Sequence, residues 1–126
     1  SSAASDVYKR QAKAYTKQKA DKKAMEDYRE LAKDTRNPYG AEAKYQVAQS
    51  LYDAKEYAAA EKELLNYIEQ STPHAYWLAR SFILLSDVYH ATGKDLDARQ
   101  YLLSLQQNYQ GNDEIESRLS KLKVEN

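Results

Sequence analysis

Few side chains in the sequence are of types that support acid–base or metal chemistry. The chain contains two histidines, His74 and His90, and no cysteine, which excludes thiol catalysis, disulfides and thiolate metal sites. His74 follows Pro73 at an expected helix start, where we expect a solvated side chain. His90 lies three residues after Asp87, so the two share one helix face, but no further partner completes a metal site. We therefore predict no enzymatic activity, no catalytic residue, no metal site and no cofactor.

A basic stretch near the N-terminus is the only feature that suggests nucleic-acid binding. It contains seven basic residues and one acidic residue, Asp21. Counterion release could give these residues a nonspecific, salt-sensitive affinity for nucleic acid. No aromatic platform interleaves with them, and the whole chain carries 19 basic and 19 acidic residues, for a formal net charge of zero. A solvated pair of helices explains the stretch equally well, so nucleic acid is an unlikely partner. The basic residues are Lys9, Arg10, Lys13, Lys17, Lys19, Lys22 and Lys23.

Composition predicts one soluble, all-α domain over residues 1–126. Hydrophobic residues make up 42% and charged residues 30%, and a mean hydropathy of −0.91 argues against membrane insertion by this segment. Three glycines and two prolines are too few for a sheet with many tight hairpins. The first residues, Ser1 and Ser2, follow no initiator methionine and resemble no signal sequence, so we expect a fragment of a longer protein.

Hydrophobic periodicity predicts seven helices. Thr72 and Pro73 are expected to begin the fifth, as N-cap and first helical residue. Apolar residues surround most of that helix over 82–89, which predicts the most buried helix of the fold. In the last helix, Ile115, Leu119 and Leu122 form one apolar face. The predicted helices span 5–17, 21–33, 41–53, 57–70, 73–92, 96–109 and 113–122.

Small residues recur at a constant spacing and divide the first six helices into pairs. Within each pair the two small residues lie 12 positions apart, as antiparallel helices require where their backbones approach closely. A tyrosine or leucine follows each small residue after three or four positions and fills the adjacent space. The small residues pair as Ala12 with Ala24, Ala48 with Ala60, and Ser86 with Ala98.

This pattern resembles the tetratricopeptide repeat (TPR), in which a small residue and an aromatic or leucine mark each helix of a hairpin. The resemblance implies an α-α superhelix, a TPR-like solenoid of three helical hairpins at about 5–38, 41–74 and 75–110 plus a C-terminal capping helix at about 112–124. The second and third repeats match best. The first repeat lacks the glycine and has Lys19 where the turn between its helices should lie. We interpret the last helix as a solubilising cap, with partner docking as the alternative.

The resemblance also implies a concave groove along the first helix of each pair. Tyr45 and Tyr52 would lie in this groove, whereas most of the twelve tyrosines have positions typical of the core. Binding of a peptide and simple solvation of the helix face are equally compatible with these residues. A clamp for a peptide carboxylate found in some members is incomplete, because Lys13 and Leu84 replace two of its residues. The implied groove residues are Lys9, Lys13, Tyr45, Gln46, Gln49, Tyr52, Arg80, Ile83, Asp87 and His90.

We therefore predict a non-catalytic protein–protein interaction scaffold or adaptor that binds a peptide or protein segment of unknown identity through its concave face. The alternative is a structural self-association segment of a longer solenoid, which would form a homo-oligomer. Nucleic-acid binding through the first hairpin is a distant third. Tyrosine-rich repeats and proline-containing connectors resemble the bacterial cell-envelope type of this family, which implies a periplasmic or outer-membrane-associated location.

Overall fold

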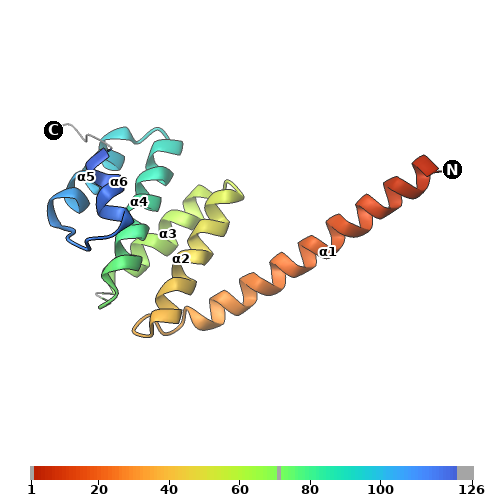
Figure 1. The fold of residues 1–126 in the computed structure, drawn as a ribbon, viewed down its shortest axis with the longest axis horizontal. Coiled ribbons are helices and arrows are strands. Elements are labelled where there is room, and N and C mark those ends of the chain that lie inside the picture. The colour runs from red at the N-terminus through yellow and green to blue at the C-terminus, as the bar shows by residue number, and fades with distance from the viewer. Residues whose placement is uncertain (1, 71, 122–126) are drawn as a thin grey trace.

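The computed structural model of the chain describes residues 2–70 and 72–121, and these residues form helices without any strand (Figure 1). The expected all-α class is confirmed. No helix in the described part of the chain is both long and apolar enough to cross a membrane. The helices are α1 (Ser2–Leu31), α2 (Pro38–Asp53), α3 (Tyr57–Glu69), α4 (Ala75–Ala91), α5 (Asp95–Asn108) and α6 (Glu114–Lys121).

Helices α2 and α3 form one hairpin and α4 and α5 form a second, as the spacing of small residues predicts. Ala48 and Ala60 are both 0% exposed and belong to the same core cluster. In the second hairpin the Ser86 hydroxyl donates a hydrogen bond of 2.8 Å to the backbone carbonyl oxygen of Ala98. This bond satisfies a buried polar side chain and holds the two helices at short range.

Helix α4 supplies much of the core that joins the two hairpins. Leu85 and Val88 are fully buried and pack in one cluster with Leu51 of α2 and Leu64 of α3. The prediction that 82–89 is the most buried stretch agrees with this packing. On the other side of α4, a smaller cluster that includes Ile83 packs against α5 and α6.

The same backbone turn closes both hairpins. Lys55 has φ 61° and Gly93 has φ 78°, both in the left-handed region. Glu56 N–H then donates to the Leu51 carbonyl at 2.9 Å, and Lys94 N–H donates to the Tyr89 carbonyl at 2.8 Å. These bonds satisfy carbonyls at the helix ends. Glycine adopts this conformation without strain, whereas lysine at the equivalent position carries a steric cost.

The predicted first hairpin is wrong, because residues 2–31 form one helix instead of two. Ala12 and Ala24 therefore lie on the same helix, and both are exposed. Residues 17–21 contain neither glycine nor proline. In the two formed hairpins the left-handed turn residue lies seven positions after the first small residue: Lys55 after Ala48 and Gly93 after Ser86. The equivalent position after Ala12 is Lys19. A left-handed lysine costs about 1–2 kcal/mol, so the helix continues through this point. The structure has two hairpins where three were expected.

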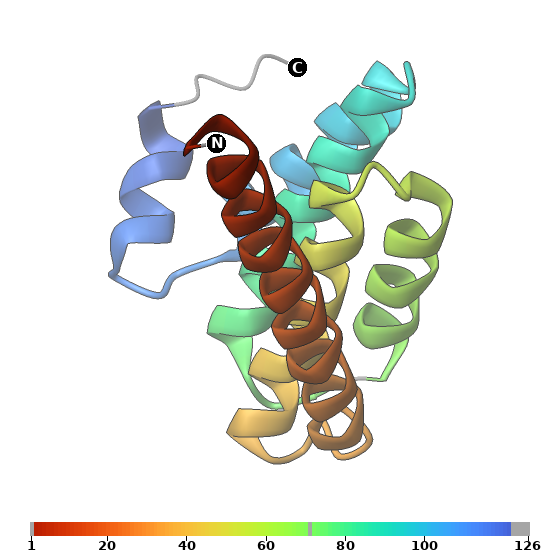
Figure 2. The same cartoon turned by 90° about the vertical axis from the view of Figure 1, so that its right-hand side faces the viewer.

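Within the described residues, it is the C-terminal end of α1 that packs against the other helices. Met25 and Tyr28 lie against the main core cluster, and Arg29 contacts Glu63 of α3 at 3.4 Å. Figure 1 shows the remainder of α1 projecting away from the bundle, and in Figure 2, turned by 90°, this part of α1 lies in front of the other helices. A 30-residue helix is about 45 Å long, so the part of α1 outside the bundle extends well beyond the other helices.

Two further predictions about helix ends are corrected by the structure. Helix α4 begins at Ala75 rather than at Pro73, and Thr72 donates its hydroxyl to Tyr67 Oη at 3.0 Å instead of capping a helix. Helix α2 begins earlier than expected, at Pro38, because Asn37 Oδ1 accepts a hydrogen bond from Tyr39 N–H at 2.8 Å and caps it.

Gly40 lies inside the first turn of α2 and does not break a helix. It is buried, and a Cβ atom there would overlap the backbone carbonyls of Leu31 and Asp34 at the end of α1. Close approach of these two backbones, rather than a positive φ, requires glycine.

The last expected helix forms as α6, and its apolar face docks against the bundle. Ile115 and Leu119 are buried against α4 and α5, and Asp113 Oδ1 accepts from Ile115 N–H at 3.0 Å just before the helix. Leu122 and the expected end of the cap at residue 124 lie outside the described residues.

We predict that Ala60→Trp lowers the free energy of unfolding by about 1–3 kcal/mol or more, because the buried contact between α2 and α3 has no space for an indole. Urea unfolding followed by circular dichroism measures this change. Ala58→Trp, on the exposed side of the same helix, is the matched control and should have little effect. An unchanged midpoint for Ala60→Trp would contradict the packing described.

Lys55→Gly should raise the free energy of unfolding by about 0.5–1 kcal/mol, because glycine removes the left-handed strain but makes the unfolded chain more flexible. Thermal and urea unfolding test this. Lys55→Ala removes the same charge and keeps the strain, so it should give no increase. Equal stabilisation by both variants would show that charge, not backbone strain, is responsible.

Candidate functional site

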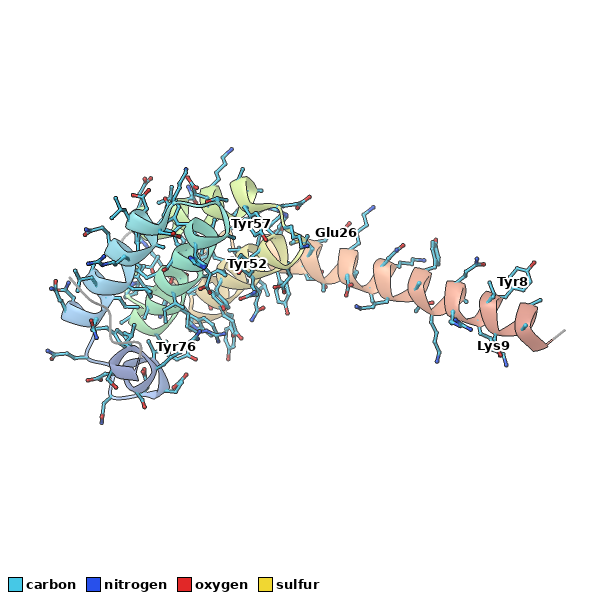
Figure 3. All side chains as sticks on the ribbon, turned by 90° about the horizontal axis from the view of Figure 1, so that it is seen from above. Tyr8, Lys9, Glu26, Tyr52, Tyr57 and Tyr76 are labelled. Atoms are coloured by element: carbon cyan, nitrogen blue, oxygen red, sulfur yellow. The ribbon has the colours of Figure 1, made fainter. Side chains whose placement is uncertain are left out.

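A groove of about 420 Å³ lies between α2, α4 and α6. Helices α2 and α4 are the leading helices of the two hairpins, and α6 follows them as the next helix in that order. The groove therefore runs across α2, α4 and α6. Figure 3 shows Tyr76 beside α6, at one wall of this groove. The lining residues are Tyr45, Gln49, Tyr76, Arg80, Ile83, Leu84, Asp87, Glu114, Ile115 and Arg118.

Arg80 lines the groove, and its guanidinium lies against aromatic rings. Its guanidinium carbon lies 4.4 Å from the Tyr45 ring centroid and 5.3 Å from that of Trp77. The Tyr45 and Trp77 rings are themselves in contact, with centroids 5.7 Å apart. Such cation–π contacts are attractive and become stronger where water is partly excluded. They fix the direction in which the guanidinium points.

The charge of Arg80 is not neutralised by a carboxylate in the described residues. The ion pairs formed by residues 2–70 and 72–121 do not include Arg80. Burial alone would lower the pKa of Arg80, but the neighbouring hydroxyls of Tyr45 and Tyr76 outweigh it and raise that pKa above its ordinary value. The Arg80 guanidinium is therefore a half-buried, positively charged hydrogen-bond donor, and its acceptor within the protein is a tyrosine hydroxyl oxygen.

A chain of hydrogen bonds leads from Arg80 along α2. Arg80 Nη2 donates to Tyr45 Oη at 3.2 Å, and the Tyr45 hydroxyl donates to Gln49 Oε1 at 2.8 Å. Gln49 Nε2 then donates to Asp53 Oδ1 at 2.9 Å. Each bond fixes the orientation of the next group, so the polar side of the groove is ordered before any ligand arrives.

Helix α6 forms the opposite wall. The Tyr76 hydroxyl donates to Glu114 Oε1 at 2.6 Å, and this hydrogen bond raises the pKa of Tyr76. Asp87 faces this wall from α4. The Asp87 carboxylate is accessible to solvent but is partly surrounded by protein groups. This partial burial raises the pKa of Asp87 above its ordinary value, and the nearby positive charge of Arg118 offsets only part of that increase. The groove thus combines two arginines with two carboxylates around an apolar floor that includes Ile83 and Ile115.

The structure brings half of the ten predicted groove residues together. These five line the groove from α2 and α4: Tyr45, Gln49, Arg80, Ile83 and Asp87.

The other five predicted residues lie elsewhere. Lys9 and Lys13 are on the exposed part of α1, and Figure 3 shows Lys9 near its far end. Gln46 lines a different hollow, between α1 and α2. Tyr52 packs edge-on against Tyr57 with ring centroids 5.6 Å apart. His90 is exposed, its Nδ1 lies 3.0 Å from Asp95 Oδ1, and it is not among the residues that line the groove.

Five of the lining residues were not expected from the sequence. Tyr76 lies one turn before Arg80, a spacing that could have revealed it. Leu84 was considered only as a replacement in an incomplete clamp. The three residues from α6 were missed because that helix was interpreted as a cap; its i, i+4 pair of charges was the available signal. These three are Glu114, Ile115 and Arg118.

The basic residues of α1 do not form a patch on the bundle. They are exposed around an isolated helix, and Lys23 pairs with Asp27 at 3.2 Å. Within the described residues, no three histidine, aspartate or glutamate side chains are grouped so as to hold a metal ion.

Comparisons with models of known protein families, with curated protein sequences and with solved structures find no match to this chain.

We predict that Asp87→Asn stabilises the protein at pH 7. Folding raises the pKa of the Asp87 carboxyl group above 3.8, so the folded state binds a proton at this group more tightly than the unfolded chain does. As the pH rises above 3.8, Asp87 must ionise in the folded state, and the free energy of unfolding falls. The advantage of the variant should therefore shrink towards pH 3. Urea unfolding at both pH values tests this, with Asp6→Asn on exposed α1 as control. Lower stability of Asp87→Asn at pH 7 would contradict the argument.

Proposed function

We propose that this chain is a non-catalytic protein–protein interaction scaffold that binds a peptide or protein segment in the groove between α2, α4 and α6. The observation that carries this proposal is Arg80, a half-buried cation held on tyrosine and tryptophan rings with no carboxylate partner in the described residues. Proteins seldom bury a charge without a partner, so an open groove around such a charge is suited to a ligand that supplies one.

The chemistry of the groove indicates a ligand that carries a carboxylate. Arginine forms two parallel hydrogen bonds with a carboxylate, which gives both affinity and a defined orientation. The carboxylate could belong to an acidic side chain or to a peptide C-terminus. Ile83 and Ile115 offer apolar surface for a neighbouring side chain of the ligand.

The scaffold supports binding because its groove is ordered in advance. Packing of α2 and α4 in one core fixes the groove walls, and the hydrogen bonds from Arg80 to Asp53 fix the polar groups. A ligand then causes little loss of conformational entropy in the protein. Recognition of this kind needs no reactive side chain.

The finer classification is part of the same proposal. Two hairpins with equivalent small residues and equivalent turns support a short TPR-like superhelix. Tyrosine-rich repeats with proline-containing connectors support the bacterial cell-envelope type and a periplasmic or outer-membrane-associated location. Nucleic-acid binding has no support from the groove, because its charges are mixed.

The proposal predicts that peptides selected from a random displayed library will share a carboxylate and need Arg80. Arg80→Met removes the charge-assisted hydrogen bonds to the peptide carboxylate, which contribute about 1.5–3 kcal/mol. We therefore expect this variant to bind the selected synthetic peptide about 10- to 100-fold more weakly. This variant keeps most of the apolar stem, so its fold should persist, and circular dichroism checks that it does. Isothermal titration calorimetry measures the affinities.

Lys62→Ala is the matched control, because it removes one positive charge from the exposed face of α3. It should bind the selected peptide as the unmodified protein does. Amidated and free-acid versions of the peptide separate a terminal carboxylate from an acidic side chain. Failure to enrich any peptide, or equal binding by Arg80→Met and Lys62→Ala, would overturn the proposal.

A further inference from the structure

A second charged group at the groove, Asp87, lacks a partner of opposite charge, as Arg80 does, in the part of the chain that the structure describes. Asp87 lines the groove from α4. Within the described residues its carboxylate takes part in no ion pair and accepts no hydrogen bond. Glu114, the other carboxylate of the groove, differs because it accepts the Tyr76 hydroxyl at 2.6 Å. Asp87 is therefore the groove carboxylate that is available to a ligand.

The protein groups around Asp87 do not fully compensate for its charge. Burial raises the pKa of Asp87, and the positive charges of Arg118 and His90 offset only part of that increase. Arg118 is exposed, and His90 Nδ1 lies 3.0 Å from Asp95 Oδ1. An ionised carboxylate at this position is therefore less favourable than in water, and a cationic group of a ligand beside it would reverse this effect.

Arg80 and Asp87 are too far apart to neutralise each other. Seven residues of α-helix rise about 10.5 Å, and positions seven apart lie on the same helix face. The Arg80 guanidinium is directed towards the start of α4, since its carbon lies 5.9 Å from the Tyr76 ring centroid and 5.3 Å from that of Trp77. The two charges therefore lie about 10 Å or more apart along one face of α4.

Apolar side chains separate the two charges. Ile83 and Leu84 are 7% and 3% exposed, line the groove and lie between Arg80 and Asp87 on α4. This face of α4 thus presents a cation, then an apolar surface, then an anion. The order is complementary to a ligand that carries a carboxylate, an apolar group and a cation in the same succession.

We propose that the groove binds a peptide that carries a lysine or arginine in addition to its carboxylate, with the carboxylate against Arg80 and the basic side chain against Asp87. This inference rests on the proposed function, because it names the ligand class of the same groove. An extended peptide advances about 3.3 Å per residue, so about three residues separate its two charged groups. A peptide with the carboxylate alone would leave Asp87 unpaired, and a second acidic side chain there would be repelled.

Selection of a displayed random peptide library against the unmodified protein and against Asp87→Asn tests the inference. We predict that peptides selected by the unmodified protein share a carboxylate and a lysine or arginine about three residues from it. Peptides selected by Asp87→Asn should keep the carboxylate and lose the preference for a basic residue. Asp97→Asn, an exposed position on α5 outside the groove, is the matched control and should select the same peptides as the unmodified protein.

Calorimetric titration with one selected synthetic peptide measures the contribution of the new pair. Replacement of the peptide's basic residue by norleucine should weaken binding to the unmodified protein about 3- to 10-fold, between the effects of exposed ion pairs and of buried charge-assisted hydrogen bonds. The same replacement should have little effect on binding to Asp87→Asn, in which the partner charge is already absent.

Two results would overturn this inference while the proposed function stands. One is selection of carboxylate peptides that need Arg80 but show no preference for a basic residue. The other is an equal effect of norleucine on binding to the unmodified protein and to Asp87→Asn. Failure to enrich any peptide would overturn both the inference and the proposed function.

Discussion

Close approach of helix backbones at small residues is the constraint on which the rest of this structure depends. Ala48 and Ala60 leave no space between α2 and α3, and Ser86 donates a hydrogen bond to the backbone of Ala98 between α4 and α5. These contacts fix the distance within each hairpin. Larger side chains beside them, such as Leu64 and Leu85, then interdigitate in one core that joins the hairpins.

The groove is a consequence of that packing. Because α2 and α4 are fixed against each other, Tyr45 and Arg80 meet at 4.4 Å across two elements far apart in sequence. Docking of α6 through Ile115 closes the third side. The aromatic rings hold a positive charge where water is partly excluded, and the proposed recognition of a carboxylate depends on this placement.

Periodicity and spacing predicted what depends on local packing rules. The all-α class and the two formed hairpins follow from pairs such as Ala48 with Ala60. The first hairpin could not be judged in this way, because the same spacing at Ala12 and Ala24 is compatible with a hairpin or with one long helix. The choice depends on the turn residue, Lys19, and on what covers the helix. Groove residues contributed by α6, such as Arg118, were not expected because the spacing of its apolar residues predicts a docked helix but not which groove its charged residues line.

Hydrogen exchange of individual amides, followed by nuclear magnetic resonance, tests the central claim most directly. If the two hairpins share one core through their small-residue contacts, the slowest amides of α2, α3, α4 and α5 should report the same opening free energy, equal to that of global unfolding. This measurement does not depend on the state of α1. Opening of α2 and α3 at a distinctly lower free energy than α4 and α5 would show two independent hairpins and contradict the account.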